Sequence, residues 1–199
     1  MRAVVFGDFE CAFSYLASHR VDRLAEHGIP VTWIAVHRCV GSARGDLRFP
    51  PDQAFEAAVV QSWLEPDESA PIHAPTVPTD TRGAVAALAA AHDADAARLR
   101  QALFDAYWVE GSDIGDPRVV EKLAGRRVPR FSLRARRWRR NWLGLGCPDL
   151  PAAILEDGTL VRGVAAVDEL TIARRKPMES VEHLHDVRDP THRGVRHRR

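Results

Sequence analysis

The 199-residue chain has few cysteines and no long apolar run. Cys11, Cys39 and Cys147 are too few and too scattered for a disulfide-stapled scaffold. No apolar run approaches the roughly 18 residues of a transmembrane helix, so we expect no membrane partner. The apolar stretch that follows Met1 is too short for the core of a signal peptide. These absences favour a cytoplasmic protein with reduced thiols.

Motifs of several common enzyme classes are also missing. The sequence contains no G-x-G-x-x-G fingerprint, no Walker phosphate loop, no H-E-x-x-H motif and no nucleophile-elbow serine. Histidines such as His183 and His192 lie in a tail that lacks the preorganised surroundings of a metal site. We therefore expect no metal and no resident cofactor.

Positive charge is concentrated in two segments, although the net charge is only +1. Residues 177–199 form a basic tail with few apolar residues, which we expect to be flexible. Residues 126–140 contain eight arginines with interleaved aromatics, a composition that suits nucleic acid. The apolar residues there recur at helical spacing, which predicts a buried stripe made of Phe131, Ala135, Trp138, Trp142 and Leu145. We favour a solvated basic face over a nucleic-acid site, with attraction of anionic thiol substrates as an alternative.

The pattern of apolar residues predicts an α/β fold. Residues 3–7 and 31–36 read as buried strands, and residues 12–27 between them have helical spacing that ends at Gly28. Such a βαβ unit brings the start of its helix to the carboxyl end of the first strand. The middle of the chain predicts helices alone, at 52–64, 79–92, 93–110, 117–125 and 132–143.

Two strands and one helix are expected after this helical block. Residues 152–155 and 159–162 flank an Asp157-Gly158 turn, which is a strong hairpin signal. Residues 167–175 then predict the last helix.

Cys11 is the residue with the clearest chemical meaning, because it lies at the start of the first predicted helix. Helix N-termini stabilise a thiolate and lower the pKa of a cysteine. The neighbouring carboxylates of Asp8 and Glu10 oppose that effect. Placement alone leaves two readings open, a nucleophile of moderate reactivity and a structural thiol. Cys39 is expected to be structural.

Three stretches together resemble the DsbA-like branch of the thioredoxin superfamily, which includes kappa-class glutathione transferases and 2-hydroxychromene-2-carboxylate isomerases. Residues 8–16, Asp-Phe-Glu-Cys-Ala-Phe-Ser-Tyr-Leu, resemble its active-site segment. Residues 103–117 resemble its helical-domain signature, and residues 150–163 resemble its cis-proline loop and hairpin. The resemblance implies a thioredoxin-like fold with an inserted all-helical domain. The implied units are 1–39 with 147–176, the helical insertion 40–146, and the tail 177–199.

The resemblance also implies roles for individual residues. Cys11 stands where the family has its nucleophile, and Ser14 stands where dithiol members have the resolving cysteine. Because Ser14 cannot attack a mixed disulfide, the C-x-x-S motif leaves only a monothiol cycle that an external thiol completes. Ser14 either donates a hydrogen bond to the thiolate or caps the first helical turn. Asp8 either relays a proton to and from Cys11 or caps its loop.

The loop before the last two strands is expected to face the nucleophile. Pro151 resembles the family's cis-proline, with Leu150 offering backbone hydrogen bonds to an extended thiol substrate, and Pro148 is the competing candidate. Cys147 is a loop cysteine or, as a second hypothesis, a resolving thiol for Cys11.

Glutathione recognition can be judged from residues 163–169. The kappa-class and isomerase members resemble this chain there, but Ala165 and Ala166 replace the small polar and acidic residues that hold the γ-glutamyl group. Helix N-terminal amides remain able to receive a carboxylate.

We therefore expect a thiol-disulfide oxidoreductase or isomerase acting on a small-molecule or protein thiol or disulfide. Glutathione or another low-molecular-weight thiol would serve only as cosubstrate. The alternatives are a kappa-class-like glutathione-dependent transferase or isomerase, and a non-catalytic thioredoxin-fold binding protein. A homodimer is left open.

Overall fold

The structure of the protein is a computed structural model that describes residues 3–37, 53–76, 79–129 and 131–175. The predictions for Cys39, for a domain boundary at residues 39 and 40, and for the tail 177–199 lie outside the described residues.

The four described strands form one mixed sheet with the order β2-β1-β3-β4. Their bounds are β1 (Ala3–Gly7), β2 (Val31–Ala35), β3 (Ala152–Ile154) and β4 (Leu160–Arg162). β1 and β2 run parallel, while β3 is antiparallel to both of its neighbours, β1 and β4. Since Gly7 pairs with Ala35 and Phe6 pairs with Ala152, the carboxyl end of β1 lies beside the end of β2 and the start of β3.

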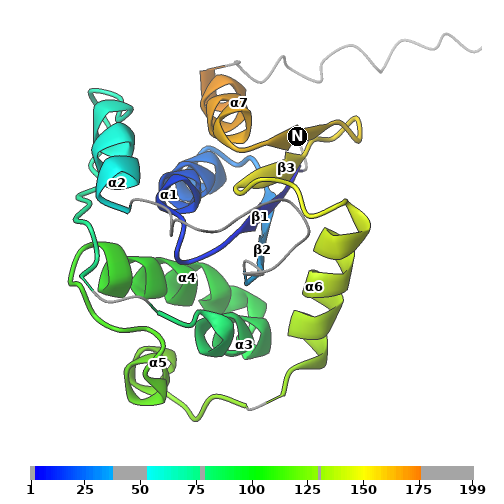
Figure 1. The fold of residues 1–199 in the computed structure, drawn as a ribbon. Coiled ribbons are helices and arrows are strands. Elements are labelled where there is room, and N and C mark those ends of the chain that lie inside the picture. The colour runs from blue at the N-terminus through cyan, green and yellow to red at the C-terminus, as the bar shows by residue number, and fades with distance from the viewer. Residues whose placement is uncertain (1–2, 38–52, 77–78, 130, 176–199) are drawn as a thin grey trace, which may run out of the picture.

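Helices cover both sides of this sheet. Figure 1 shows α1 (Ala12–Glu26) and α2 (Gln53–Ser62) on one side and α6 (Leu133–Gly144) on the other. The last helix, α7 (Val164–Arg175), packs against α1. The remaining described helices lie together at one end of the sheet and are α3 (Arg82–Ala90), α4 (Asp93–Trp108) and α5 (Pro117–Ala124). None of the helices in the described ranges is long and apolar enough to cross a membrane.

Most predicted elements are present, with small shifts at their ends. The α7 helix begins three residues before the predicted residue 167, because Gly163 turns the chain directly out of β4. Gly163 has a φ of 56°, and its amide donates to Pro151 O at 2.7 Å. The Asp157-Gly158 turn is confirmed, with Asp157 Oδ1 accepting from Thr159 N at 2.8 Å.

One aromatic residue departs from its predicted apolar stripe. Trp138 and Trp142 are buried as expected, but Phe131 is 57% exposed. Phe131 precedes Ser132, the N-cap of α6, so it does not follow the helical periodicity of the tryptophans. Its ring instead lies 5.4 Å from the guanidinium of Arg136.

The core connects the helices after β2 to the loop that follows β1. The ring centroids of Phe9 and Phe104 lie 4.8 Å apart, and both side chains are buried. The indole N–H of Trp108, which is also buried, donates to Phe9 O at 2.9 Å. Helix α4 thereby fixes the backbone segment that leads into α1.

A buried ion pair links α1 to the chain that follows α2. Arg20 Nε donates to Glu68 Oε1 at 3.0 Å, and its other nitrogens donate to Trp63 O and Val167 O. Burial alone would raise the pKa of Glu68, but hydrogen bonds from Arg20 and the Glu65 amide, with the nearby arginine charges, lower it below 4.5. The ionised pair therefore contributes stability at neutral pH.

Replacing Glu68 with Gln is expected to destabilise the protein by roughly 3 kcal/mol at pH 7, since it leaves Arg20 buried without a counter-charge. A carboxyl with a lowered pKa stabilises the fold above its unfolded value and loses that effect as the pH falls through its folded value. The difference between wild type and Glu68→Gln is thus expected to shrink below pH 4.5. Urea unfolding at several pH values measures this difference in the free energy of unfolding. Asp80→Asn, in the exposed Asp80–Arg82 pair, is the control and should change stability far less.

Gly7 ends β1 at a point where no side chain fits. A Cβ atom at Gly7 would lie 2.3 Å from Trp33 Cζ2 and 3.2 Å from Ser14 Cβ. The Trp33 ring cannot move away easily, because the Arg100 guanidinium covers it at 5.2 Å and the Phe104 ring meets its edge. Glycine here lets the sheet and α1 approach closely.

Gly7→Ala is therefore expected to destabilise the protein by about 1–3 kcal/mol through overpacking. Gly83→Ala is the matched control, because a Cβ at Gly83 in α3 meets nothing within 4 Å. That control should be neutral or stabilising by up to about 1 kcal/mol, as alanine is the better helix former. Equal stability of the two variants in thermal unfolding would contradict the close approach at Gly7.

Candidate active site at the start of α1

Cys11 is the N-cap residue of α1, one position before the first helical residue. Its backbone is extended, with φ −106° and ψ 117°, and its carbonyl accepts from Tyr15 N at 3.0 Å. Its own amide donates to Asp8 O at 3.1 Å, which closes the turn between β1 and α1. The thiol thus lies at the positive end of the α1 dipole, as predicted from the sequence.

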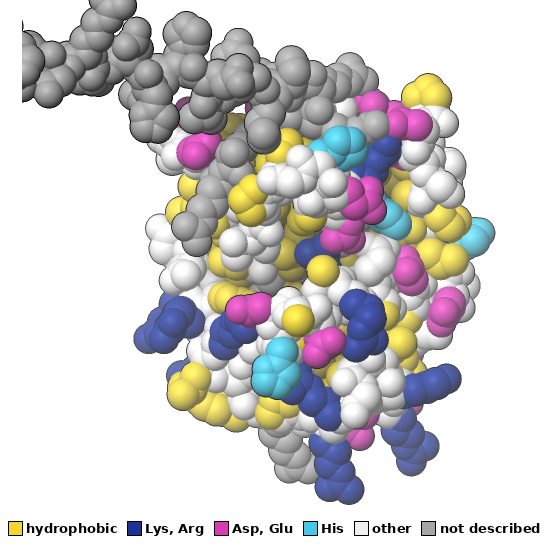
Figure 2. Space-filling view, turned by 180° about the vertical axis from the view of Figure 1, so that it is seen from behind, with side chains coloured by type: hydrophobic (Ala, Val, Ile, Leu, Met, Phe, Trp, Pro, Cys, Tyr) yellow, Lys and Arg dark blue, Asp and Glu magenta, His cyan; other side chains and the backbone are white. Residues whose placement is uncertain are grey.

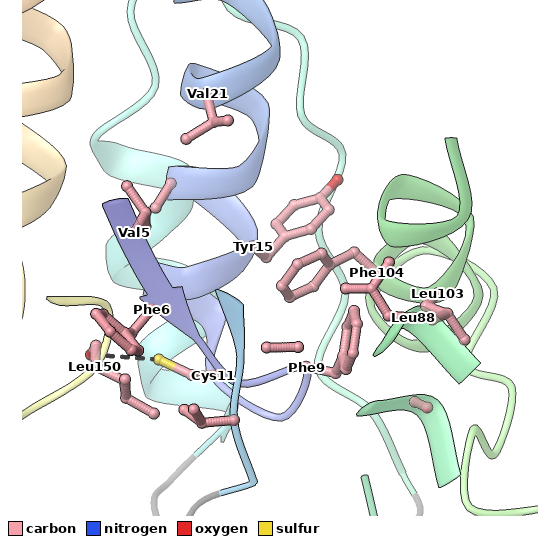
Figure 3. Close-up of a cluster of buried hydrophobic side chains, with 14 of the residues drawn as sticks. Val5, Phe6, Phe9, Cys11, Tyr15, Val21, Leu88, Leu103, Phe104 and Leu150 are labelled. Atoms are coloured by element: carbon pink, nitrogen blue, oxygen red, sulfur yellow. Dashed lines mark hydrogen bonds between the residues drawn. The ribbon is translucent and has the colours of Figure 1, made fainter. Parts of the chain in front are cut away.

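The thiol faces the loop that precedes β3. Cys11 Sγ donates to Leu150 O at 3.6 Å, across 139 positions of sequence (Figure 3). The Leu150–Pro151 peptide bond is cis, and it is the only cis bond among the described residues, so Pro148 is not the cis-proline. The structure therefore brings together Cys11, Leu150 and Pro151, which sequence reasoning had placed in one site.

Cys11 is completely buried, with 0% of its surface exposed. Figure 3 shows its sulfur beside the side chain of Phe6 and facing Leu150. A substrate reaches this sulfur only after a local displacement of the atoms that cover it.

Asp8 and Ser14 are buried, and a hydrogen bond joins the Asp8 amide to the Ser14 hydroxyl. Ser14 Oγ accepts from Asp8 N at 3.3 Å, and Asp8 Oδ1 accepts from Glu10 N at 3.3 Å. The Asp8 carboxylate therefore caps its own loop. The Ser14 hydroxyl fixes the backbone amide of Asp8, the residue that follows β1. The hydrogen bonds described for Ser14 do not include one to Cys11 Sγ.

Sequence reasoning missed two polar residues beside Asp8. The Thr81 hydroxyl, which is fully buried, donates to Asp8 Oδ1 at 2.9 Å. His37 Nδ1 lies 3.0 Å from Thr81 Oγ1. His37 follows β2, so its position could have been inferred from the shared edge of the parallel strands. Thr81 precedes a helix and by its sequence is an ordinary N-cap.

Cys147 lies close in sequence to the site but is not bonded to Cys11. No disulfide joins these two cysteines in the part of the chain that the structure describes. Cys147 is partly exposed, and its backbone has a φ of 52°. Its amide donates to Trp142 O at 3.3 Å, which places it at the end of α6.

The first turn of α7 offers little polar side-chain chemistry. Ala165 is exposed and Ala166 is fully buried, and neither side chain can hydrogen-bond a ligand. Across the described ranges, no group of three or more His, Cys, Asp or Glu side chains is arranged to hold a metal ion.

The arginines of α6 are exposed, while its buried face consists of Trp138 and Trp142. Arg134 pairs with Asp93 at 3.0 Å and covers the Trp138 ring at 5.2 Å. On the face drawn in Figure 2, Lys and Arg side chains alternate with acidic and uncharged ones. That face does not carry one continuous basic surface.

The comparisons with known proteins agree with this architecture. A family model described as DSBA-like thioredoxin domain matches residues 3–127, and a search of the curated proteins found no match. The solved structure of a 2-hydroxychromene-2-carboxylate isomerase has a TM-score of 0.64 and 21% identity, covering 88% of this chain and 93% of that one. The cytosolic disulfide reductase DsbM from Pseudomonas aeruginosa, solved with GSH, has a TM-score of 0.58 and 19% identity, with coverage of 88% and 96%.

The two structural likenesses show the fold, which is the predicted thioredoxin-like α/β fold with inserted helices. The family model covers more than half of the chain, including β1, α1 and the helices as far as α5. The chain therefore belongs to the family of DSBA-like thioredoxin domains.

Proposed function

We propose that the protein catalyses thiol-disulfide exchange through Cys11 alone. The observation that carries the proposal is the position of Cys11 Sγ, at the N-terminus of α1 and 3.6 Å from Leu150 O. A helix N-terminus stabilises the thiolate that attacks a disulfide. The adjacent Leu150 backbone offers hydrogen bonds to an extended substrate. Family membership supports the same chemistry.

The proposed reaction has two exchange steps. In the first step the Cys11 thiolate attacks one sulfur of a substrate disulfide, a Cys11–substrate disulfide forms, and the other half leaves as a thiolate that takes up a proton. In the second step an external thiolate attacks the substrate sulfur, and Cys11 leaves as the thiolate. One disulfide is exchanged for another, so no electron acceptor is consumed.

The Leu150 carbonyl provides a trigger for thiolate formation. In the resting site Cys11 is a thiol, because it donates its proton toward Leu150 O. A backbone N–H of an extended substrate competes for the same carbonyl oxygen. This additional hydrogen bond weakens the one from the thiol to the same oxygen, so the Cys11 proton passes more readily to a base.

Asp8 is the base that we assign to this proton. Asp8 belongs to the turn that Cys11 N closes on the main-chain oxygen of Asp8 at 3.1 Å, so the two residues move together when the site opens. Ser14 acts as a positioning residue, since its Oγ accepts from the Asp8 amide. The hydrogen bond from the Asp8 amide to Ser14 keeps the turn in shape while substrate is bound.

The external thiol is of low molecular weight in this proposal, with glutathione as the first candidate. The structure of DsbM was solved with GSH, which supports testing this thiol. Because Ala165 and Ala166 lack polar side chains, glutathione would bind as a passing cosubstrate and not as a tightly held cofactor. A monothiol cycle of this kind suits a reducing compartment such as the cytoplasm.

Cys11→Ser is expected to abolish exchange between a peptide disulfide and glutathione, because the nucleophile is lost. Cys147→Ser is the matched control and should retain the wild-type rate within about twofold. Rates are measured by the release of peptide thiol under excess glutathione. Loss of activity in Cys147→Ser with retention in Cys11→Ser would reverse the assignment of the nucleophile.

Ser14→Cys is expected to convert the monothiol site into a dithiol site. In a background with Cys39 and Cys147 replaced by serine, one aromatic disulfide reagent should release one equivalent of chromophoric thiolate from the parent protein. The Ser14→Cys variant should release two equivalents, because the new thiol attacks the mixed disulfide at Cys11. Intact mass should show a stable adduct on the parent and none on the variant. A persistent adduct on both proteins would place residue 14 out of reach of Cys11.

A further inference from the structure

A chain of hydrogen bonds leads from the end of β2 to the carboxylate of Asp8. His37 Nδ1 lies 3.0 Å from Thr81 Oγ1, and the Thr81 hydroxyl donates to Asp8 Oδ1 at 2.9 Å. Asp8 and Thr81 have no exposed surface, whereas His37 is partly exposed. The three side chains therefore connect the solvent to a buried acid.

The hydrogen bonds between these three side chains all point, from donor to acceptor, toward Asp8. The single hydroxyl proton of Thr81 is given to Asp8 Oδ1, so Thr81 Oγ1 is the acceptor of the bond with His37. His37 therefore carries a proton on Nδ1, and each group points its proton toward Asp8. Such an arrangement passes a proton to Asp8 by two short shifts without any side chain turning.

Thr81 is not needed to cap α3. Its backbone is already helical, with φ −74° and ψ 0°, and its side chain makes no capping bond. Asp80 Oδ1 accepts from Arg82 N, at the start of α3, at 3.1 Å. The Thr81 hydroxyl serves Asp8 instead, which is a contact 73 positions away in sequence.

We propose that His37 and Thr81 form a proton relay that charges and discharges Asp8 from the solvent. When His37 is an imidazolium, its Nδ1 proton moves to Thr81 Oγ1 while the Thr81 proton moves to Asp8 Oδ1. The products are a neutral imidazole that keeps its Nε2 proton and a neutral carboxyl group. The reverse movement returns the proton to His37, and water removes it at Nε2.

The catalytic use of the relay rests on the proposed function. In the first exchange step Asp8 passes the Cys11 proton on to the leaving thiolate, and the inward-pointing protons of Thr81 and His37 then recharge Asp8. Asp8 returns that proton to Cys11 when Cys11 leaves as a thiolate in the second step. The route through Thr81 and His37 supplies the proton without passing the substrate.

Several charged groups surround the relay and bear on its pH dependence. Asp80 and Arg82, at the start of α3, lie near His37, and the pKa of Asp80 is lowered first by its hydrogen bond from Arg82 and last by the charge of His37. Glu10 and Asp113 lie on the Asp8 side. Burial raises the pKa of Tyr107 in α4 to about 12, and the charges of Glu10, Asp8 and Asp113 add to that rise.

Three variants separate the relay from a merely structural contact. His37→Asn keeps a side-chain N–H for Thr81 but does not titrate, Thr81→Val removes the hydroxyl at nearly constant shape, and Thr81→Ser restores it. His37→Asn and Thr81→Val are expected to lower the exchange rate about tenfold, part of the roughly 100-fold that a positioned proton carrier contributes. Thr81→Ser should recover most of the rate, and added imidazole should rescue His37→Asn. Thermal unfolding of His37→Asn should match wild type.

A second readout does not require turnover. In a pH titration of the wild type by NMR, the Asp8 carboxyl ¹³C shift should include a transition with the midpoint of the His37 ring ¹⁵N. Thr81→Val should remove that shared transition, while Asp80→Asn, which changes a charge near His37 outside the relay, should keep it.

The outcomes separate the relay from the proposed function. Wild-type rates in His37→Asn and Thr81→Val would overturn the relay and leave the function of Cys11 intact. Absence of exchange activity in the wild type would overturn the proposed function. The relay would then stand if the shared NMR transition is present and sensitive to Thr81→Val, and would fall if the wild type shows no such transition.

Discussion

The turn between β1 and α1 is buried, so its polar atoms must find donors in distant parts of the chain. The Trp108 indole reaches Phe9 O, and the Thr81 hydroxyl reaches the Asp8 carboxylate. Leaving such a buried acceptor unsatisfied costs roughly 1–3 kcal/mol. The turn therefore keeps its shape only when the helices after β2 are folded against it. The inserted helices are therefore part of the site, because they supply donors to its buried turn.

The same turn is closed from the other side by the loop before β3. Cys11 Sγ meets Leu150 O, and Gly163 N holds Pro151 O at 2.7 Å, so the loop is anchored to the end of β4. The sheet order explains why this is possible, since β1 lies between β2 and β3. Segments from the beginning, middle and end of the chain thus meet at one edge of a four-stranded sheet.

The apolar periodicity of the sequence was sufficient for the strands and helices, because each buries one face in the core. It failed at Phe131, which lies one residue before a helix and so is outside the helical repeat. Cys11 and Leu150 could be paired through the family resemblance, although 139 positions separate them. Thr81 was not found, because a hydroxyl before a helix predicts a local cap, and only the three-dimensional structure shows that it turns to Asp8 instead.

Complete burial of Cys11 determines the order of events in the proposed reaction. A sulfur without exposed surface does not meet dissolved thiols until the site opens, and that opening must be supported by binding energy. An extended peptide can engage the Leu150 carbonyl next to the sulfur, so a peptide disulfide is expected to react faster than a small disulfide. Docking at this carbonyl weakens the hydrogen bond that holds the Cys11 proton, so substrate binding also promotes thiolate formation. The closed resting site slows oxidation of the thiol between turnovers, because a small oxidant reaches the sulfur only while the site is open.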